Sequence, residues 1–173
     1  MLIAASAALL RYDVHQRHRA NVEYPLLFAN MVRAAAQGDE YQSTAIARST
    51  LERARELLTS APDDMRIQFI AATACLRLQR FEEGIRYCDE AVRIDRRPEI
   101  YFLRGELELH AGRRDRAIRD FASAAEFTPI YLDRLTDPSL RLEVEEEVRI
   151  RGEAVRQKSL SSRLFAVARS PAV

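Results

Sequence analysis

The fold is decided by residues 65–129, which read MRIQFIAATACLRLQRFEEGIRYCDEAVRIDRRPEIYFLRGELELHAGRRDRAIRDFASAAEFTP. One pattern occurs twice in this stretch at an offset of 33 residues, which places Phe69 on Phe102 and Ala72 on Gly105. The other matched pairs are Leu76/Leu109, Gln79/Gly112, Gly84/Ala117, Ile85/Ile118, Cys88/Phe121 and Ala91/Ala124. Self-similarity at a period of about 34 residues indicates helix–turn–helix units that stack on one another.

The whole chain reads as helical. Its 173 residues include only six prolines and five glycines, and no window alternates between apolar and polar residues as a strand would. We therefore predict an all-α fold, a short α-solenoid of about three helix–turn–helix repeats with a C-terminal capping helix.

Within the two clear units we expect helices over residues 65–78, 81–94, 99–111 and 114–127. Small residues stand where two helices should cross closely, namely Ala72, Gly84, Gly105 and Ala117. Gly112 supplies the left-handed residue of a tight turn. Gln79 stands in the equivalent place, so we expect that turn to be strained or built differently.

These residues resemble the tetratricopeptide repeat. In the last copy, residues 98–129, the family pattern is matched by Arg104-Gly105, Gly112, Ala117, Phe121, Ala124 and Pro129. The copy before it, residues 65–97, matches at Ala72, Phe81, Gly84, Ala91 and Asp95 and departs at Gln79 and Arg96. The resemblance implies an array whose first helices line a concave groove that holds a peptide or a partner helix, and it implies no particular ligand.

The flanks complete the prediction. Residues 25–62 look like a diverged copy, with one helix opened by Pro25 and stopped at Gly38-Asp39 and a second over 40–59. In residues 130–158 a short connector, with at most one helical turn, leads to a capping helix that begins at Asp137-Pro138 and ends near Gln157. Residues 159–173 form a tail, either a short docking helix or a loose end.

Residues 1–24 allow three interpretations. Residues 2–10 (LIAASAALL) are apolar, and Arg11–Arg19 is basic. The segment is a helix that packs on the repeats or on a partner, a membrane contact made through residues 1–20, or a signal segment with Ala5-Ser6-Ala7 as its cleavage site. As a helix, nine apolar residues span about 14 Å, roughly half of a hydrocarbon core.

The composition excludes several functions. The 27 basic and 26 acidic residues are mixed along the chain, so no basic face indicates nucleic acid binding. All basic residues except Lys158 are arginine, which suggests a bacterial source with a GC-rich genome. Cys75 and Cys88 fall at apolar positions and are expected to be buried thiols.

No constellation of residues indicates an enzyme. The sequence has no phosphate-binding loop, no nucleophile elbow, no cofactor motif and no paired Cys-x-x-Cys. His15 and His18 share a spacing that can bind metal but lack a third ligand, and His110 stands alone near a turn. We therefore expect no catalytic residues, no metal site and no cofactor.

The candidate partner-binding groove follows from the repeat geometry and comprises Arg66, Phe69, Thr73, Leu76, Glu99, Phe102, Glu106 and Leu109. Phe, Leu and Glu replace the basic clamp with which some members of the family hold acidic C-terminal tails, so an apolar peptide or helix is favoured. The alternative is that this stripe of Phe and Leu is packing between the repeats.

The sequence favours a non-enzymatic scaffold or assembly subunit of a larger bacterial complex, which docks a partner through the concave face or the termini. One alternative is a small secretion or export chaperone with an apolar groove, and another is a regulatory or enzymatic piece of a longer protein. We expect the chain in the cytoplasm or on the cytoplasmic face of the membrane, or in the periplasm if residues 1–10 are a signal segment.

Overall fold

A computed structural model describes residues 2–36 and 40–168, and the side chains of residues 18–36 and 40–158. The described residues are helical and contain no strand. The helices are α1 (Leu2–Ala36), α2 (Glu40–Ser60), α3 (Met65–Arg77), α4 (Phe81–Ile94), α5 (Pro98–His110), α6 (Arg114–Phe127), α7 (Ile130–Asp133) and α8 (Pro138–Ala168). The chain is therefore all-α, as predicted.

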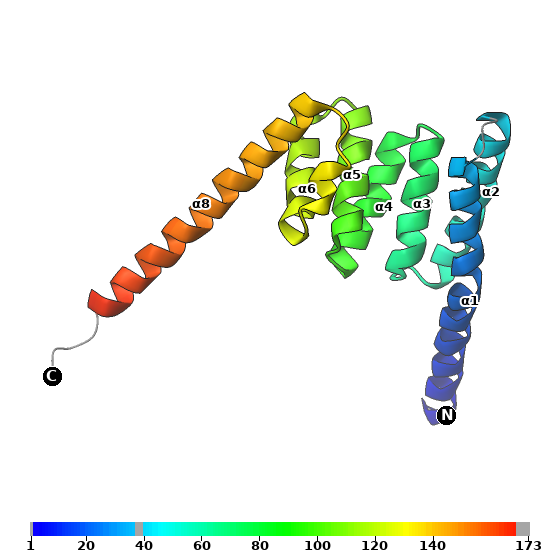
Figure 1. Ribbon diagram of the computed structural model, residues 1–173. Coiled ribbons are helices and arrows are strands. Elements are labelled where there is room, and N and C mark those ends of the chain that lie inside the picture. Colours follow the sequence, from blue (N-terminus) through cyan, green and yellow to red (C-terminus); the bar gives the residue numbers. More distant parts are fainter. Residues whose placement is uncertain (1, 37–39, 169–173) are drawn as a thin grey trace.

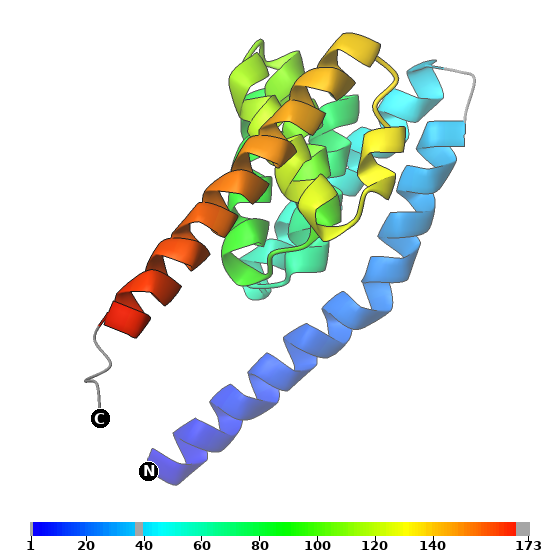
Figure 2. The same cartoon turned by 60° about the vertical axis from the view of Figure 1, so that its left-hand side comes forward.

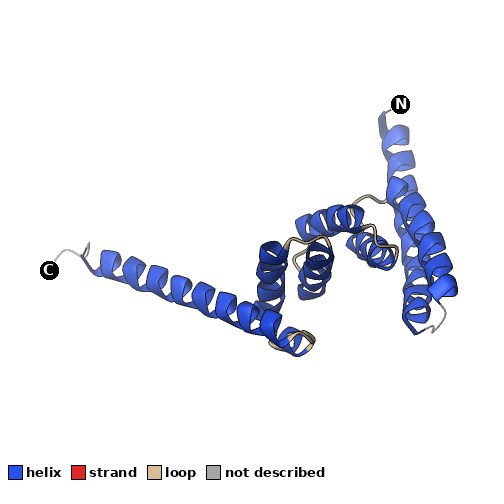
Figure 3. Cartoon of the chain, turned by 90° about the horizontal axis from the view of Figure 1, so that it is seen from above, coloured by secondary structure: helices blue, strands red, loops and turns tan. Residues whose placement is uncertain are grey.

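The helices stack as successive pairs. α1 packs on α2, α3 on α4 and α5 on α6, while contacts of α2 with α3 and of α4 with α5 join one pair to the next. Figure 1 shows the pairs side by side, and Figure 3 shows from above that the array curves. α8 packs on α6 at the end of the array and then extends away from it (Figure 1). This arrangement confirms the predicted short helical solenoid with a C-terminal capping helix.

Two predicted boundaries were wrong. Pro25 does not open a helix but lies inside α1, which joins residues 2–24 to the helix expected after them. A proline within a helix leaves one carbonyl without its donor and favours a bend, and α1 changes direction along its length (Figure 2). The expected stop at Gly38-Asp39 lies outside the described residues.

The second boundary is at the other end of the chain. α8 does not end near Gln157 but continues to Ala168, so most of the predicted tail belongs to the capping helix. The sequence between these residues contains no glycine or proline that would stop a helix. The predicted single turn of the connector is α7.

Both repeat turns have the same backbone geometry. Gln79 has φ +56° and Gly112 has φ +76°. The residue after each donates its N–H to the carbonyl five residues earlier. Arg80 donates to the Cys75 carbonyl at 2.9 Å, and Arg113 donates to the Glu108 carbonyl at 2.8 Å. This is the Schellman closure of a helix end. The turn at Gln79 is thus strained rather than built differently, because a side chain occupies the left-handed region.

The small residues permit the predicted close approaches between helices. A Cβ on Gly105 would lie 2.7 Å from a ring carbon of Phe121, and a Cβ on Gly84 would lie 2.7 Å from a methyl carbon of Leu107. Phe121 is 2% exposed and Leu107 fully buried, so neither has room to withdraw.

One partly buried ion network joins three helices. Arg104 of α5 binds Asp120 of α6 through two nitrogens, at 2.6 and 2.8 Å, and Asp89 of α4 at 2.7 Å. The Arg104 and Asp120 side chains are 19% and 11% exposed. The contact ties the last pair of helices to the pair before it.

Candidate functional site

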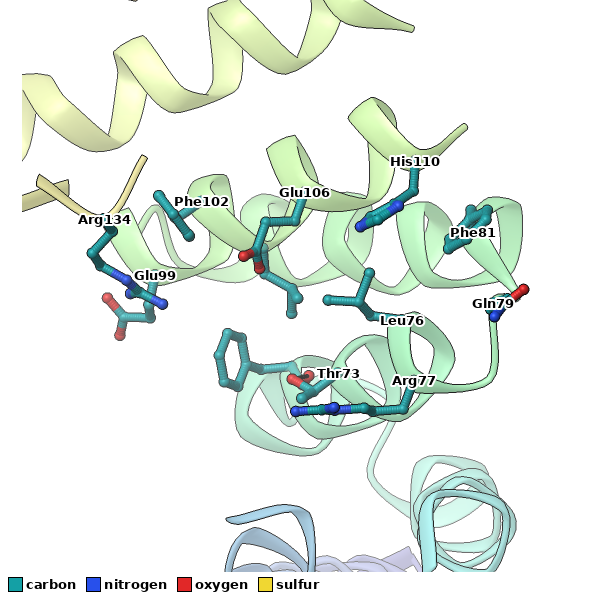
Figure 4. A pocket seen from close by; sticks show the side chains of 12 residues that line it. Thr73, Leu76, Arg77, Gln79, Phe81, Glu99, Phe102, Glu106, His110 and Arg134 are labelled. Atoms are coloured by element: carbon teal, nitrogen blue, oxygen red, sulfur yellow. Dashed lines mark hydrogen bonds between the residues drawn. The ribbon is translucent and has the colours of Figure 1, made fainter. Parts of the chain in front are cut away.

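A groove of about 690 Å³ lies between α3 and α5. Its lining comprises Phe69, Thr73, Leu76, Arg77, Gln79, Phe81, Glu99, Phe102, Leu103, Glu106, His110 and Arg134. The α3 residues face those of α5 because side chains three and four positions apart share one side of a helix. Figure 4 shows the two rows, with Phe81 of α4 at one end and Arg134 of the α7–α8 connector at the other.

Six of the eight predicted groove residues line this groove, namely Phe69, Thr73, Leu76, Glu99, Phe102 and Glu106. The other two lie elsewhere. Arg66 donates to Asp64 at 2.7 Å and to the side-chain oxygen of Asn21 at 2.6 Å, on the side of α3 that faces α1. Leu109 is half-buried and packs with the cluster formed by α5, α6 and α8.

Aromatic rings form the two ends of the groove. Phe81 stacks on His110, with the ring centroids 5.3 Å apart and the planes 12° from parallel. At the other end Phe102 is only 4% exposed, because Phe121 and Tyr131 contact it and Arg134 covers its face with its guanidinium carbon 4.2 Å from the ring centroid. Phe102 is therefore mainly packing.

Phe69 and Leu76 are half-buried and give the groove its apolar surface. The hydroxyl of Thr73, between them on α3, already donates to the Phe69 carbonyl at 2.8 Å. The two interpretations made from the sequence thus divide by residue. Phe102 packs between elements, whereas Phe69 and Leu76 pack on the core of α3, α4 and α5 with one side and line the open space of the groove with the other.

Glu106 carries the one acidic group near the centre of the lining. It is half-buried, and burial raises the pKa of its carboxyl against the opposing charges of Arg134, His110 and Arg77. Glu99 is the second carboxylate and lies at the same end as Arg134 (Figure 4).

The residues missed by the sequence reasoning are Arg77, Gln79, Phe81, Leu103, His110 and Arg134. His110 follows Glu106 by four positions and Arg77 follows Thr73 by four, so helical spacing would have found both. Arg134 comes from the connector, and no periodicity points to it.

The two cysteines and the described histidines form neither a reactive thiol site nor a cluster of metal ligands. Cys75 and Cys88 are free and buried, as expected, and burial raises the pKa of the Cys75 thiol to about 12 and that of Cys88 as well. Thiols held protonated in this way are poor nucleophiles. Within the described part of the chain no three His, Cys, Asp or Glu side chains gather as a metal site would require. His15 lies outside the described side chains, and His18 is exposed.

One observation concerns the predicted membrane contact. Among the residues that the structure describes, no helix carries an apolar run long enough to cross a bilayer.

The comparison with known families agrees with the geometry. The tetratricopeptide repeat model matches residues 42–98, which cover most of α2, all of α3 and α4, and the first residue of α5. No curated protein matches the chain. Such repeats mediate contacts between proteins. The paired helices, the Schellman turns and this match together support a tetratricopeptide repeat architecture, and the family match itself covers residues 42–98.

Proposed function

We propose that this protein is a non-enzymatic scaffold or assembly subunit of a larger bacterial complex, and that it docks a partner protein in the groove between α3 and α5. The observation that carries the proposal is the half-buried pair Phe69 and Leu76, which face an open space of about 690 Å³. Apolar side chains that converge on a concave surface gain free energy when a partner covers them.

Helix α1, at the N-terminal edge of the array, supplies a second docking surface for the same role. α1 exposes four large apolar side chains on its outer side: Val22 (62% exposed), Leu26 (61%), Phe28 (47%) and Val32 (53%). A cluster of this kind at the edge of an array is the sort of surface that a neighbouring subunit covers.

The groove is tested by affinity purification from the native source followed by mass spectrometry. The double variant F69A/L76A should lose a set of co-purifying proteins that the wild type retains. L142A is the matched control, because Leu142 is 66% exposed on α8 and lies outside the groove. Circular dichroism shows whether each variant folds. Retention of every partner by a folded F69A/L76A protein would overturn the proposed role of the groove.

We place the scaffold in the cytoplasm or on the cytoplasmic face of the membrane, where residues 1–20 would contact lipid or a membrane protein. The apolar residues 2–10 support this placement, since a helix with such an end can lie in an interface. Fractionation of cells that express the full chain provides the test. Recovery of the intact chain in the soluble fraction alone contradicts the membrane contact.

A further inference from the structure

Glu106 differs from the other acidic side chains that α5 and α6 withdraw from solvent. Asp120 binds Arg104 at 2.6 Å, and Glu108 binds Arg113 at 3.2 Å. Glu106 is half-buried, yet no group in the described parts of the chain donates a hydrogen bond or forms an ion pair with it. Figure 4 shows its carboxylate pointing into the groove. Among the described residues of α5 and α6, Asp120 and Glu108 are thus paired, whereas Glu106 is left without a partner.

The cations around the groove do not have the same need for a partner. Arg77 and Arg134 are exposed, so water solvates their charges, and Arg134 also rests on the Phe102 ring. An exposed cation gains little from an added anion. A half-buried carboxylate is in the opposite situation, because any apolar partner that fills the groove removes its remaining water.

Filling the groove with purely apolar groups would therefore bury an unpaired charge, and the desolvation of that charge opposes the gain from the apolar contacts. The cost is avoided if the partner brings its own cationic donor to the carboxylate.

We propose that the groove binds an extended apolar segment of a partner protein that carries one lysine or arginine, whose charged nitrogen pairs with Glu106. Phe69 and Leu76 contact the apolar residues on either side. This inference rests on the proposed function of the groove and adds the chemistry of its partner.

The test is selection of random peptides displayed on phage against the immobilised full chain, in parallel with E106Q and E99Q. Glu99 lines the same groove and is the matched control. The wild type and E99Q should select peptides with apolar residues around one basic residue. E106Q should select apolar peptides without the basic residue.

The strongest selected peptide is then measured by fluorescence anisotropy. E106Q should weaken its binding about tenfold or more, since a charge-assisted pair is lost. Norleucine in place of the basic residue should weaken binding to the wild type by a similar factor and leave binding to E106Q unchanged.

Four outcomes count against the inference, and two of them also count against the proposed groove. Peptides that lack a basic residue but bind the wild type and not F69A/L76A overturn the inference and leave the groove as a docking site. Basic peptides that bind E106Q as well as the wild type overturn the inference too. Peptides whose binding F69A/L76A leaves intact, or the absence of any selected peptide, count against both the inference and the proposed groove.

Discussion

Arg134 lies over Phe102, with its guanidinium carbon 4.2 Å from the centre of the ring. The connector after the last repeat thus covers an aromatic residue that repeat geometry alone would leave open. Phe102 is 4% exposed and contacts Phe121 and Tyr131, so its replacement would disturb packing before it disturbed binding. Phe69 and Leu76 are the better probes of the groove for this reason.

Removal of the Arg134 charge should raise the pKa of Glu106 further. Arg134 is the largest of the three positive influences that oppose burial at this carboxyl, ahead of His110 and Arg77. We expect R134Q to move the Glu106 carboxyl titration to higher pH, as followed by carbon-13 NMR of labelled protein. R86Q, outside the groove, is the control. A titration that stays in place, or moves to lower pH, would contradict the expected influence of Arg134.

E106Q should stabilise the protein near neutral pH but not in acid. Because burial raises the folded-state pKa of Glu106 above the ordinary value of 4.5, the folded protein binds more protons than the unfolded chain between these two values. The wild type therefore loses stability as pH rises through that window, whereas glutamine does not titrate. Thermal unfolding should give equal Tm values for both proteins below about pH 4 and a higher Tm for E106Q at pH 7. Equal values at both pH values would show that burial does not penalise this carboxylate.

Replacement of Gly105 and of Gly152 by alanine should change the free energy of unfolding in opposite directions. The new Cβ at position 105 would press on the buried Phe121 ring at 2.7 Å, and overpacking of this kind costs about 1–3 kcal/mol. At position 152 in α8 no atom lies within 4 Å, so alanine should stabilise the helix by roughly 0.5–1 kcal/mol. Urea unfolding of G105A and G152A measures both changes. A neutral G105A would mean that α5 and α6 can separate without loss.

Replacement of Gln79 by glycine should stabilise the folded protein at this turn. Its φ of +56° places a side chain in the left-handed region, at a cost of roughly 1–2 kcal/mol that glycine avoids. Q79G should raise the urea midpoint, and G112A, with φ +76° at the equivalent turn, should lower it. A destabilised Q79G would indicate that the Gln79 side chain makes a contact worth more than the strain.

Arg104 should be among the more costly arginines to replace. R104M leaves Asp120 without its partner in a site where the aspartate is 11% exposed, and breaking a buried pair costs roughly 3–5 kcal/mol. We expect the lower end of that range, because Arg104 itself is 19% exposed. R149M is the control, since Arg149 makes two ion pairs on the open surface of α8 and its loss should leave the unfolding midpoint unchanged. Similar midpoints for the two variants would contradict a structural role for the Arg104 network.

The sequence predicted the regular part of the fold well, because each local signal agreed with the repeat. Helices 81–94 and 114–127 begin and end at the predicted residues. The helix predicted over 65–78 ends one residue earlier, and the helix predicted over 99–111 both begins and ends one residue earlier. The spacing of Phe69, Thr73 and Leu76 on one helix and Glu99, Phe102 and Glu106 on the next placed these residues in one groove.

The misses occurred where a local rule competed with tertiary contact. Pro25 favours a helix start, but Leu27 and Met31 are buried in the cluster formed with α2 and α3, which holds the helix together across the proline. Arg66 was assigned to the groove by its position on α3, yet Asp64 and Asn21 draw it to the α1 side. Arg134 reaches the groove only through the path of the connector, which periodicity does not describe.

The contact of Arg104 with both Asp89 and Asp120 also affects the flexibility of the array between its repeats. Repeat arrays flex at the boundaries between repeats, since each unit contacts only its neighbours. Arg104 of α5 forms ion pairs with α4 and with α6, so it opposes rotation of α5 relative to α4 across such a boundary. It therefore helps to hold α5 against α4, the helix that packs on α3, and a groove whose width is set in this way would lose little ordering entropy when a partner docks.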